Sequence, residues 1–176
     1  MNFSFPIVMQ AGPYDCGPAC LATVAHTHGL VFEPDGLSPV PVGGASLFEL
    51  ARVARSIGFE AQGIRLPISE LDGIPLPAIA HLDFGDGPQG RGHYVVVHAR
   101  CEEGLTVADP SQGIRFMPWD VFDRVWSGQL LLLSPKSGSD PREAIEPLEE
   151  RVDFMSEHGR VGPSSSVSSM GNWFKA

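Results

Sequence analysis

Four residues of this chain have the types and the order that chemistry at a cysteine nucleophile needs: Gln10, Cys16, His93 and Asp109. In such a site the cysteine attacks, the histidine moves the proton and the carboxylate orients the histidine. A glutamine amide can donate a hydrogen bond to the oxyanion that forms after the attack. The set therefore predicts covalent catalysis through Cys16.

Cys16 lies at the start of a predicted helix that runs from residue 16 to about residue 28. Asp15 is a suitable N-cap, Pro18 falls in the first turn, where a missing N–H costs nothing, and Gly29 ends the helix. The aligned peptide dipoles at a helix start stabilise a thiolate and lower its pKa. We therefore expect a reactive thiol, against the alternative of a buried structural cysteine.

His93 opens a β-branched run directly after a loop, residues 84–92, that is rich in glycine. This position predicts a histidine at a sheet edge that faces a cleft. Strand alternation places His98 on the opposite face, so His98 is not a second catalytic histidine on the side of His93.

Asp109 closes the following predicted strand. It would lie opposite His93 if the hairpin folded at residue 101, whereas the turn signal, at residues 101–104, comes slightly later. A β-bulge, or a carboxylate that reaches diagonally, would bring the two side chains together. Asp109 precedes Pro110, so a plain turn residue is the alternative.

The other candidates have weaker support. Gln10 alone would be a surface glutamine before a turn, and its place ahead of a nucleophile favours the oxyanion role. Cys20 is expected to face the core and Cys101 to lie exposed in a turn. Cys16 and Cys20 do not have a zinc spacing and no second close pair exists, so no metal or cofactor is predicted.

Composition narrows the class of protein. The chain has 176 residues, 43% of them hydrophobic, and a net charge of -9. This charge argues against nucleic acid and against an anionic membrane surface as partners. Three cysteines cannot form a complete disulfide framework. No signal peptide and no apolar stretch of about 20 residues is present. We expect a soluble protein of a reducing compartment, the cytoplasm.

The pattern of elements predicts an α+β fold in which an N-terminal helical part precedes an antiparallel sheet. A second helix is expected from residue 47 to about 57 after the cap Ser46, and a short helix at residues 118–126. The expected strands are residues 59–65, 77–83, 94–99, 105–108, 114–117 and 129–133. Residues 1–135 would form one domain, and residues 136–176 a polar linker and tail.

On these residues the chain resembles the papain-like cysteine peptidases that process bacteriocins and other secreted peptides, which occur as the N-terminal domain of peptidase-containing ABC transporters. The resembling segments are Gln10, residues 15–21, residues 92–97 and residues 108–111. The resemblance covers roughly residues 7 to 135. Its motifs are specific when taken together and weak separately.

The resemblance implies a papain-like fold in which Cys16 is the nucleophile, His93 the general base and acid, Asp109 the residue that orients His93, and Gln10 part of the oxyanion hole. It implies cleavage of precursor peptides after a Gly-Gly or Gly-Ala pair, with removal of a leader that binds partly as an amphipathic helix. The implied partners are the precursor peptide and an ABC transporter or other export machinery.

Two other functions remain open at this point. An acyltransferase would use the same acyl-enzyme and pass the acyl group to an amine. A non-catalytic module would only bind the leader, although the presence of Cys16, His93 and Asp109 together argues against it. Where transporter members continue into membrane helices, this chain has a polar tail. Residues 142–154 could form a docking helix, and a disordered or tag-like spacer is the alternative.

Overall fold

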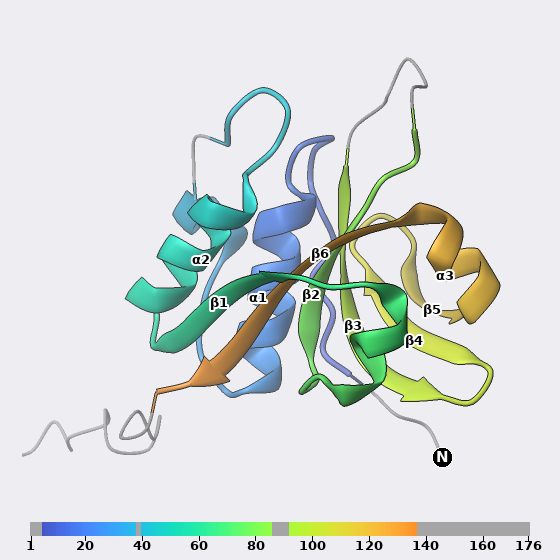
Figure 1. Cartoon of the computed structure of the whole chain (residues 1–176). Helices are drawn as coiled ribbons and strands as arrows, with labels where there is room; N and C mark the ends of the chain where they lie inside the picture. Colours follow the sequence, from blue (N-terminus) through green and yellow to red (C-terminus); the bar gives the residue numbers. More distant parts are fainter. Residues whose placement is uncertain (1–4, 38–39, 86–91, 137–176) are drawn as a thin grey trace, which may run out of the picture. The chain divides into compact units, whose positions relative to one another are not determined.

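The computed structural model describes residues 5–37, 40–85 and 92–136. Residues 86–91 of the predicted glycine-rich loop and residues 137–176 of the predicted tail, with the possible docking helix at residues 142–154, lie outside these ranges. Figure 1 shows the arrangement: α1 and α2 lie beside the sheet on one side, and α3 lies on the other. This is the predicted α+β fold.

Three α-helices are present in the described part of the chain: α1 (Cys16–Thr27), α2 (Leu47–Ser56) and α3 (Trp119–Val125). The capping signal before α2 is confirmed, because the Ser46 hydroxyl accepts a hydrogen bond from the N–H of Glu49 and the Glu49 side chain accepts one from the N–H of Ser46. Two 3₁₀ helices, η1 (Pro34–Leu37) and η2 (Ile68–Gly73), were not predicted.

The N-cap of α1 differs from the expectation in one respect. Asp15 occupies the N-cap position, but its side chain makes no capping hydrogen bond. Its carboxylate lies against Gly12 instead, where an added Cβ would come within 3.0 Å of Oδ2. The helix is therefore held at its start by burial: residues from Cys16 to Ala25 are all buried.

Six strands form one antiparallel sheet in the order β1-β6-β2-β3-β4-β5. Their bounds are Phe59–Arg65, Ala78–Leu82, His93–Cys101, Gly104–Asp109, Gly113–Pro118 and Trp126–Pro135 for β1 to β6. Each overlaps a predicted strand. The last strand is much longer than expected and begins before Gly128, whose φ of +82° few other residues adopt.

The sheet separates two clusters of buried apolar side chains. One contains α1 and α2 with residues such as Val96 and Leu131, and the other contains residues such as Val95, Leu71 of η2 and Phe122 of α3. Neighbouring residues of β3 thus point to opposite faces, as alternation requires.

A β-bulge in β3 decides which residues of β4 share a face with His93. Near the hairpin, Ala99 pairs with Thr106, but beyond a register shift Val97 pairs with Val107. Paired residues point to the same face, so Asp109 shares the face of Val107, Val97 and His93. Without the shift Asp109 would point to the other face.

Candidate active site

Cys16 and His93 meet where the start of α1 lies against the start of β3. The Cys16 thiol is buried and forms a hydrogen bond with the His93 side chain. It also accepts hydrogen bonds from the backbone N–H groups of Gly17 and Tyr94. His93 is partly open to solvent, with 18% of its side chain exposed. A substrate could therefore reach the pair from outside.

Asp109 lies behind His93 and is completely buried. Its Oδ1 accepts hydrogen bonds from His93 Nε2 at 2.9 Å, from the Ser111 N–H at 2.9 Å and from the Ser111 hydroxyl at 2.6 Å. Its Oδ2 accepts one from Arg115 Nη2 at 3.0 Å. Since Nε2 of His93 is occupied by Asp109, Nδ1 is the nitrogen left for Cys16.

The contacts shift the pKa of all three groups toward their charged forms. Burial alone would raise the pKa of Cys16, but the hydrogen bonds to His93 and to backbone N–H groups bring it below its usual value. Burial alone would lower the pKa of His93, but Asp109 and Cys16 raise it to about 9. Burial would raise the pKa of Asp109, but His93 and Ser111 hold it well below its usual range. This arrangement favours a thiolate beside an imidazolium.

Gln10 lies beside the strand end that carries Asp109, because its backbone N–H donates to the carbonyl of Pro110 at 2.9 Å. Its side-chain Nε2 donates to the carbonyl of Gly12 at 2.9 Å, and Oε1 has no hydrogen-bond partner among the described residues. An amide nitrogen carries two hydrogens, so one remains beyond the bond to Gly12.

The other two cysteines have different surroundings. Cys20, one turn after Cys16 on α1, is buried, and burial together with the charges of Cys16 and Asp109 raises the pKa of its thiol well above the usual value. Cys101 is exposed at the β3–β4 turn and is not bonded to a histidine; its thiol pairs with Glu103. Both lie where the sequence placed them.

Several neighbours of the site were missed at the level of sequence. Ser111 and Arg115 donate hydrogen bonds to Asp109. The sequence did contain a signal for them: they lie two and six residues after Asp109, where a tight turn and the next antiparallel strand return the chain to that carboxylate. His81 was also missed. Its ring lies 5.1 Å from that of Tyr94 and its Nδ1 is bonded to Ser127 at 2.9 Å.

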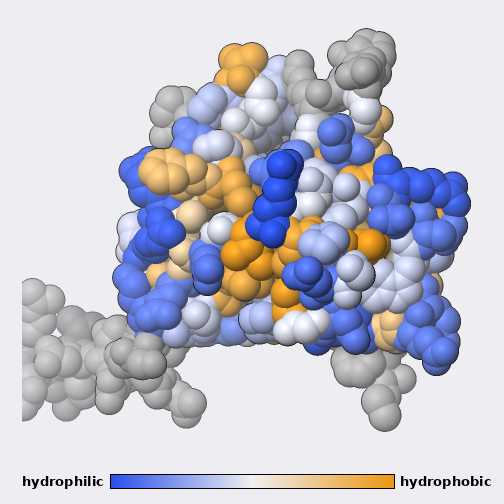
Figure 2. All heavy atoms as spheres, viewed as in Figure 1, coloured by the Kyte–Doolittle hydropathy of each residue, from blue (hydrophilic) through white to orange (hydrophobic). Residues whose placement is uncertain are grey.

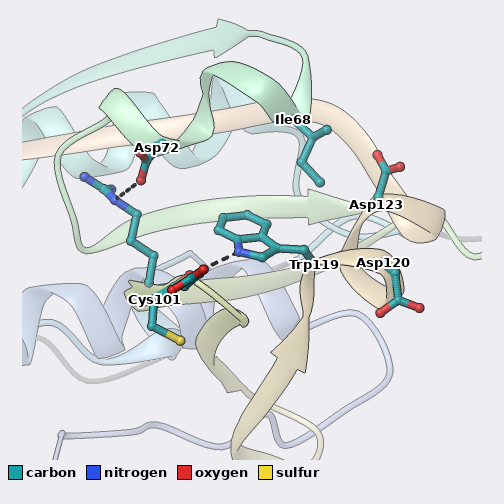
Figure 3. Close-up of a pocket in the computed structure, with 8 residues that line it drawn as sticks. Ile68, Asp72, Cys101, Trp119, Asp120 and Asp123 are labelled. Atoms are coloured by element: carbon teal, nitrogen blue, oxygen red, sulfur yellow. Dashed lines mark hydrogen bonds and ion pairs between the residues drawn. The ribbon is translucent and has the colours of Figure 1, made fainter.

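A cavity of about 770 Å³ lies elsewhere, at the opposite end of β3, lined by Ile68, Asp72, Arg100, Cys101, Glu102, Trp119, Asp120 and Asp123. Figure 3 shows two interactions among the lining residues: Arg100 Nε bonds Asp72 at 3.1 Å, and the Trp119 indole donates to the carbonyl of Cys101 at 3.1 Å. None of the four candidate catalytic residues lines it. Cavity size therefore does not mark the candidate active site.

A model of the peptidase C39 family matches residues 4–138, which contain all four candidate residues. The chain belongs to this family. Among curated relatives of the family, it is 31% identical over 156 residues to the lactococcin-G-processing and transport ATP-binding protein LagD of Lactococcus lactis subsp. lactis. That match covers 85% of this chain and 21% of LagD, so the chain spans about a fifth of that transporter.

Solved C39 peptidase domains share the fold. The peptidase domain of Streptococcus ComA, a bifunctional ABC transporter of a quorum-sensing pathway, is 27% identical with a TM-score of 0.68 over 76% of this chain and 100% of that domain. A double-glycine-motif protease from an AMS/PCAT transporter, in complex with its leader peptide, is 26% identical with a TM-score of 0.67, over 75% of this chain and 92% of that one.

Among the residues the structure describes, no group of three or more His, Cys, Asp or Glu side chains is arranged to hold a metal ion. The same residues include no helix of the length and apolarity that crossing a bilayer requires.

Proposed function

We propose that this protein is a cysteine endopeptidase that cleaves leader peptides from precursor peptides after a Gly-Gly or Gly-Ala pair. The observation that carries the proposal is the hydrogen-bonded row of Cys16, His93 and Asp109 in a chain of the C39 family. We further propose that it acts in the cytoplasm on a precursor bound for an ABC transporter, because LagD and ComA are named as ATP-binding proteins of transport and processing.

In the first half of the proposed reaction, the Cys16 thiolate attacks the carbonyl carbon of the second glycine, and a C–S bond forms. The carbonyl oxygen takes the negative charge and accepts hydrogen bonds from the free Nε2 hydrogen of Gln10 and from a backbone N–H at the start of α1. His93 then gives its proton to the leaving amine as the C–N bond breaks. The product peptide leaves and a thioester remains on Cys16.

In the second half, water attacks the thioester carbonyl carbon while His93 accepts a proton from that water. The C–S bond breaks, and the leader leaves as a carboxylic acid. Asp109 keeps the imidazole in one orientation during both proton transfers and stabilises its charged form. His93 and Cys16 return to the imidazolium and thiolate.

The part of the substrate that precedes the glycines needs a surface next to the nucleophile. A groove of about 630 Å³ lies between α2 and β1, lined by Leu47, Phe48, Ala51, Arg55, Gly63, Ile64, Arg65 and Gln129. Figure 2 shows apolar side chains gathered on the face that carries β1 and β6, bordered by hydrophilic ones. The side chain of Phe48 is 73% exposed. An amphipathic leader helix would place its apolar side on the floor of this groove, and acidic residues on its polar side would pair with Arg55 and Arg65.

Helix α2, which forms one wall of this groove, also packs against the start of α1. Leu50, on the inner side of α2, packs so closely on Gly17 that a Cβ there would lie 3.1 Å from Leu50 Cδ1. The same Cβ would lie 3.3 Å from the Tyr94 ring. We propose that a leader helix bound on α2 is followed by an extended segment that reaches Cys16.

The test uses the full chain and a synthetic precursor with a Gly-Gly pair, followed by mass spectrometry of the products. We expect two fragments, the leader ending in a free carboxylate after the second glycine. A precursor with both glycines replaced by valine is the control and should stay intact. Cleavage that persists unchanged in Cys16→Ala, or a leader recovered only as an amide of an added amine, would contradict the proposal.

A further inference from the structure

Three charged side chains form a line across three neighbouring strands, on one face of the sheet. His93 lies on β3, Asp109 on β4 and Arg115 on β5. Asp109 shares its oxygens between the two cations: Oδ1 accepts from His93 at 2.9 Å and Oδ2 accepts from Arg115 at 3.0 Å. The register explains the contact, because Val107 pairs with Arg115 and Asp109 with Gly113, which makes Asp109 and Arg115 diagonal neighbours.

We propose that Arg115 is a positioning residue that sets the acidity of His93 through Asp109, an inference that rests on the proposed peptidase function. Arg115 holds Oδ2 of Asp109 and compensates part of its negative charge, so the imidazolium is stabilised less than a lone carboxylate would stabilise it. His93 must keep its proton beside the thiolate and still release it to the leaving amine. An intermediate basicity serves both steps.

The charged and titratable groups around His93 and Asp109 support this role of Arg115. The groups that face it are Cys16 from α1 and Asp109 from β4, and His81 from β2 adds a smaller repulsion when charged. Asp109 in turn is faced by Ser111, by Arg115 and, from α1, by Cys20. Arg115 is the one cationic side chain bonded to this carboxylate besides His93 among the described residues.

The position of Arg115 leaves one of its own hydrogen-bond donors without a partner. Its Nε is buried with no hydrogen-bond partner among the described residues, and only 32% of its side chain is exposed. If the guanidinium only linked β4 to β5, it could rotate until Nε was hydrated. Instead Nε stays buried while Nη2 is bonded to Asp109. Ser111 already donates two hydrogen bonds to Oδ1, so the orientation of Asp109 toward His93 does not depend on Arg115 alone.

The experiment follows the His93 imidazole by NMR during a pH titration of the full chain, without substrate. In Arg115→Met we expect the His93 pKa to rise by about one unit, because the uncompensated carboxylate favours the imidazolium. The high-pH limb of kcat/KM for peptide cleavage should move upward by the same amount. Arg115→Lys keeps the positive charge and should show the same His93 pKa as the wild type. If Arg115→Met does not fold, Arg115→Gln removes the charge, keeps a donor and should raise the pKa as well.

Arg124→Met is the matched control, because Arg124 forms an exposed ion pair with Asp120 on α3, 2.6 Å long. It should leave the His93 titration unchanged. A His93 pKa that stays at the wild-type value in folded Arg115→Met or Arg115→Gln, or that shifts equally in Arg115→Lys, would overturn the proposal. The titration needs no peptide, so a chain that fails to cleave while the pKa shifts would refute the peptidase function and leave the role of Arg115 standing.

Discussion

The two ends of strand β3 carry similar residues and have different chemistry. At the His93 end, a buried thiol touches an imidazole that is held by a buried carboxylate. At the Cys101 end, an exposed thiol lies beside a glutamate, and the nearby arginine is bonded to Asp72. A carboxylate offers a thiolate no compensating charge. The comparison teaches that burial with a histidine partner, and not exposure or a nearby cavity, distinguishes the candidate nucleophile.

The largest expected effect separates these two ends directly. Cys16→Ala should lower kcat/KM for cleavage of a Gly-Gly precursor by about 10⁴-fold or more, because the acyl-enzyme cannot form. Cys101→Ser is the matched control at the other end and should change kcat/KM by less than about twofold. Steady-state kinetics on both variants tests the comparison. Equal losses in the two variants would remove the distinction between the ends of β3.

The next effect concerns Asp109, the buried carboxylate that is bonded to His93. Asp109→Asn should lower kcat/KM by about 10²- to 10³-fold, because a neutral amide stabilises the imidazolium poorly. Kinetics on Asp72→Asn, at the Cys101 end, provides the control and should match the wild type. An Asp109→Asn enzyme with wild-type activity would mean that His93 does not depend on Asp109.

The pH dependence follows from the same ion pair. The His93 pKa is raised to about 9, so wild-type activity should fall as pH rises through about 9 and the imidazolium loses its proton. It should also fall at low pH, where the Cys16 thiolate becomes protonated. The raised His93 pKa adds stability that is complete below its ordinary value of 6.5 and is lost as pH rises through about 9. The pH dependence of kcat/KM and of the free energy of unfolding tests both expectations. A kcat/KM profile that falls on one side only would contradict them.

Part of this site could be predicted from the residues alone. Cys16 stands out because Pro18 and Gly29 bracket a helix, and His93 because alternation begins there. The contact between His93 and Asp109 could only be stated as two alternatives. The bulge in β3 puts Asp109 on the face of His93, and the carboxylate then reaches diagonally, since Val96 pairs with Ala108. The bulge depends on the pairing of two strands, which no local pattern contains.

The remaining gaps have the same origin. The contact from Arg115 to Asp109 depends on the β4–β5 register, and η2 depends on the burial of its Leu71 in the second cluster. Asp15 looked like a side-chain cap because its type and position fit, yet its carboxylate lies against Gly12. Local propensity predicted the helices and strands, although β6 is longer than expected and η1 and η2 were missed. Contacts between distant segments decided the site.

The smallest effect tests the groove rather than the chemistry. Phe48→Ala should raise KM for a full-length precursor by about tenfold and leave kcat nearly unchanged. It removes a contact with the leader that is made equally in the ground state and in the transition state. A short peptide with only the glycines and the following residues should show no difference. Phe116→Ala, an exposed phenylalanine on β5, is the control, and a KM that rises equally in it would argue against a groove at α2.

The most direct test of the central claim is to trap the nucleophile. The full chain is incubated with a peptide whose Gly-Gly end carries a chloromethyl ketone, and the modified residue is located by tandem mass spectrometry. The structure predicts a single adduct on Cys16, absent from Cys16→Ala, with Cys20 and Cys101 unmodified. An adduct on Cys101, or continued precursor cleavage with Cys16 fully blocked, would contradict the account.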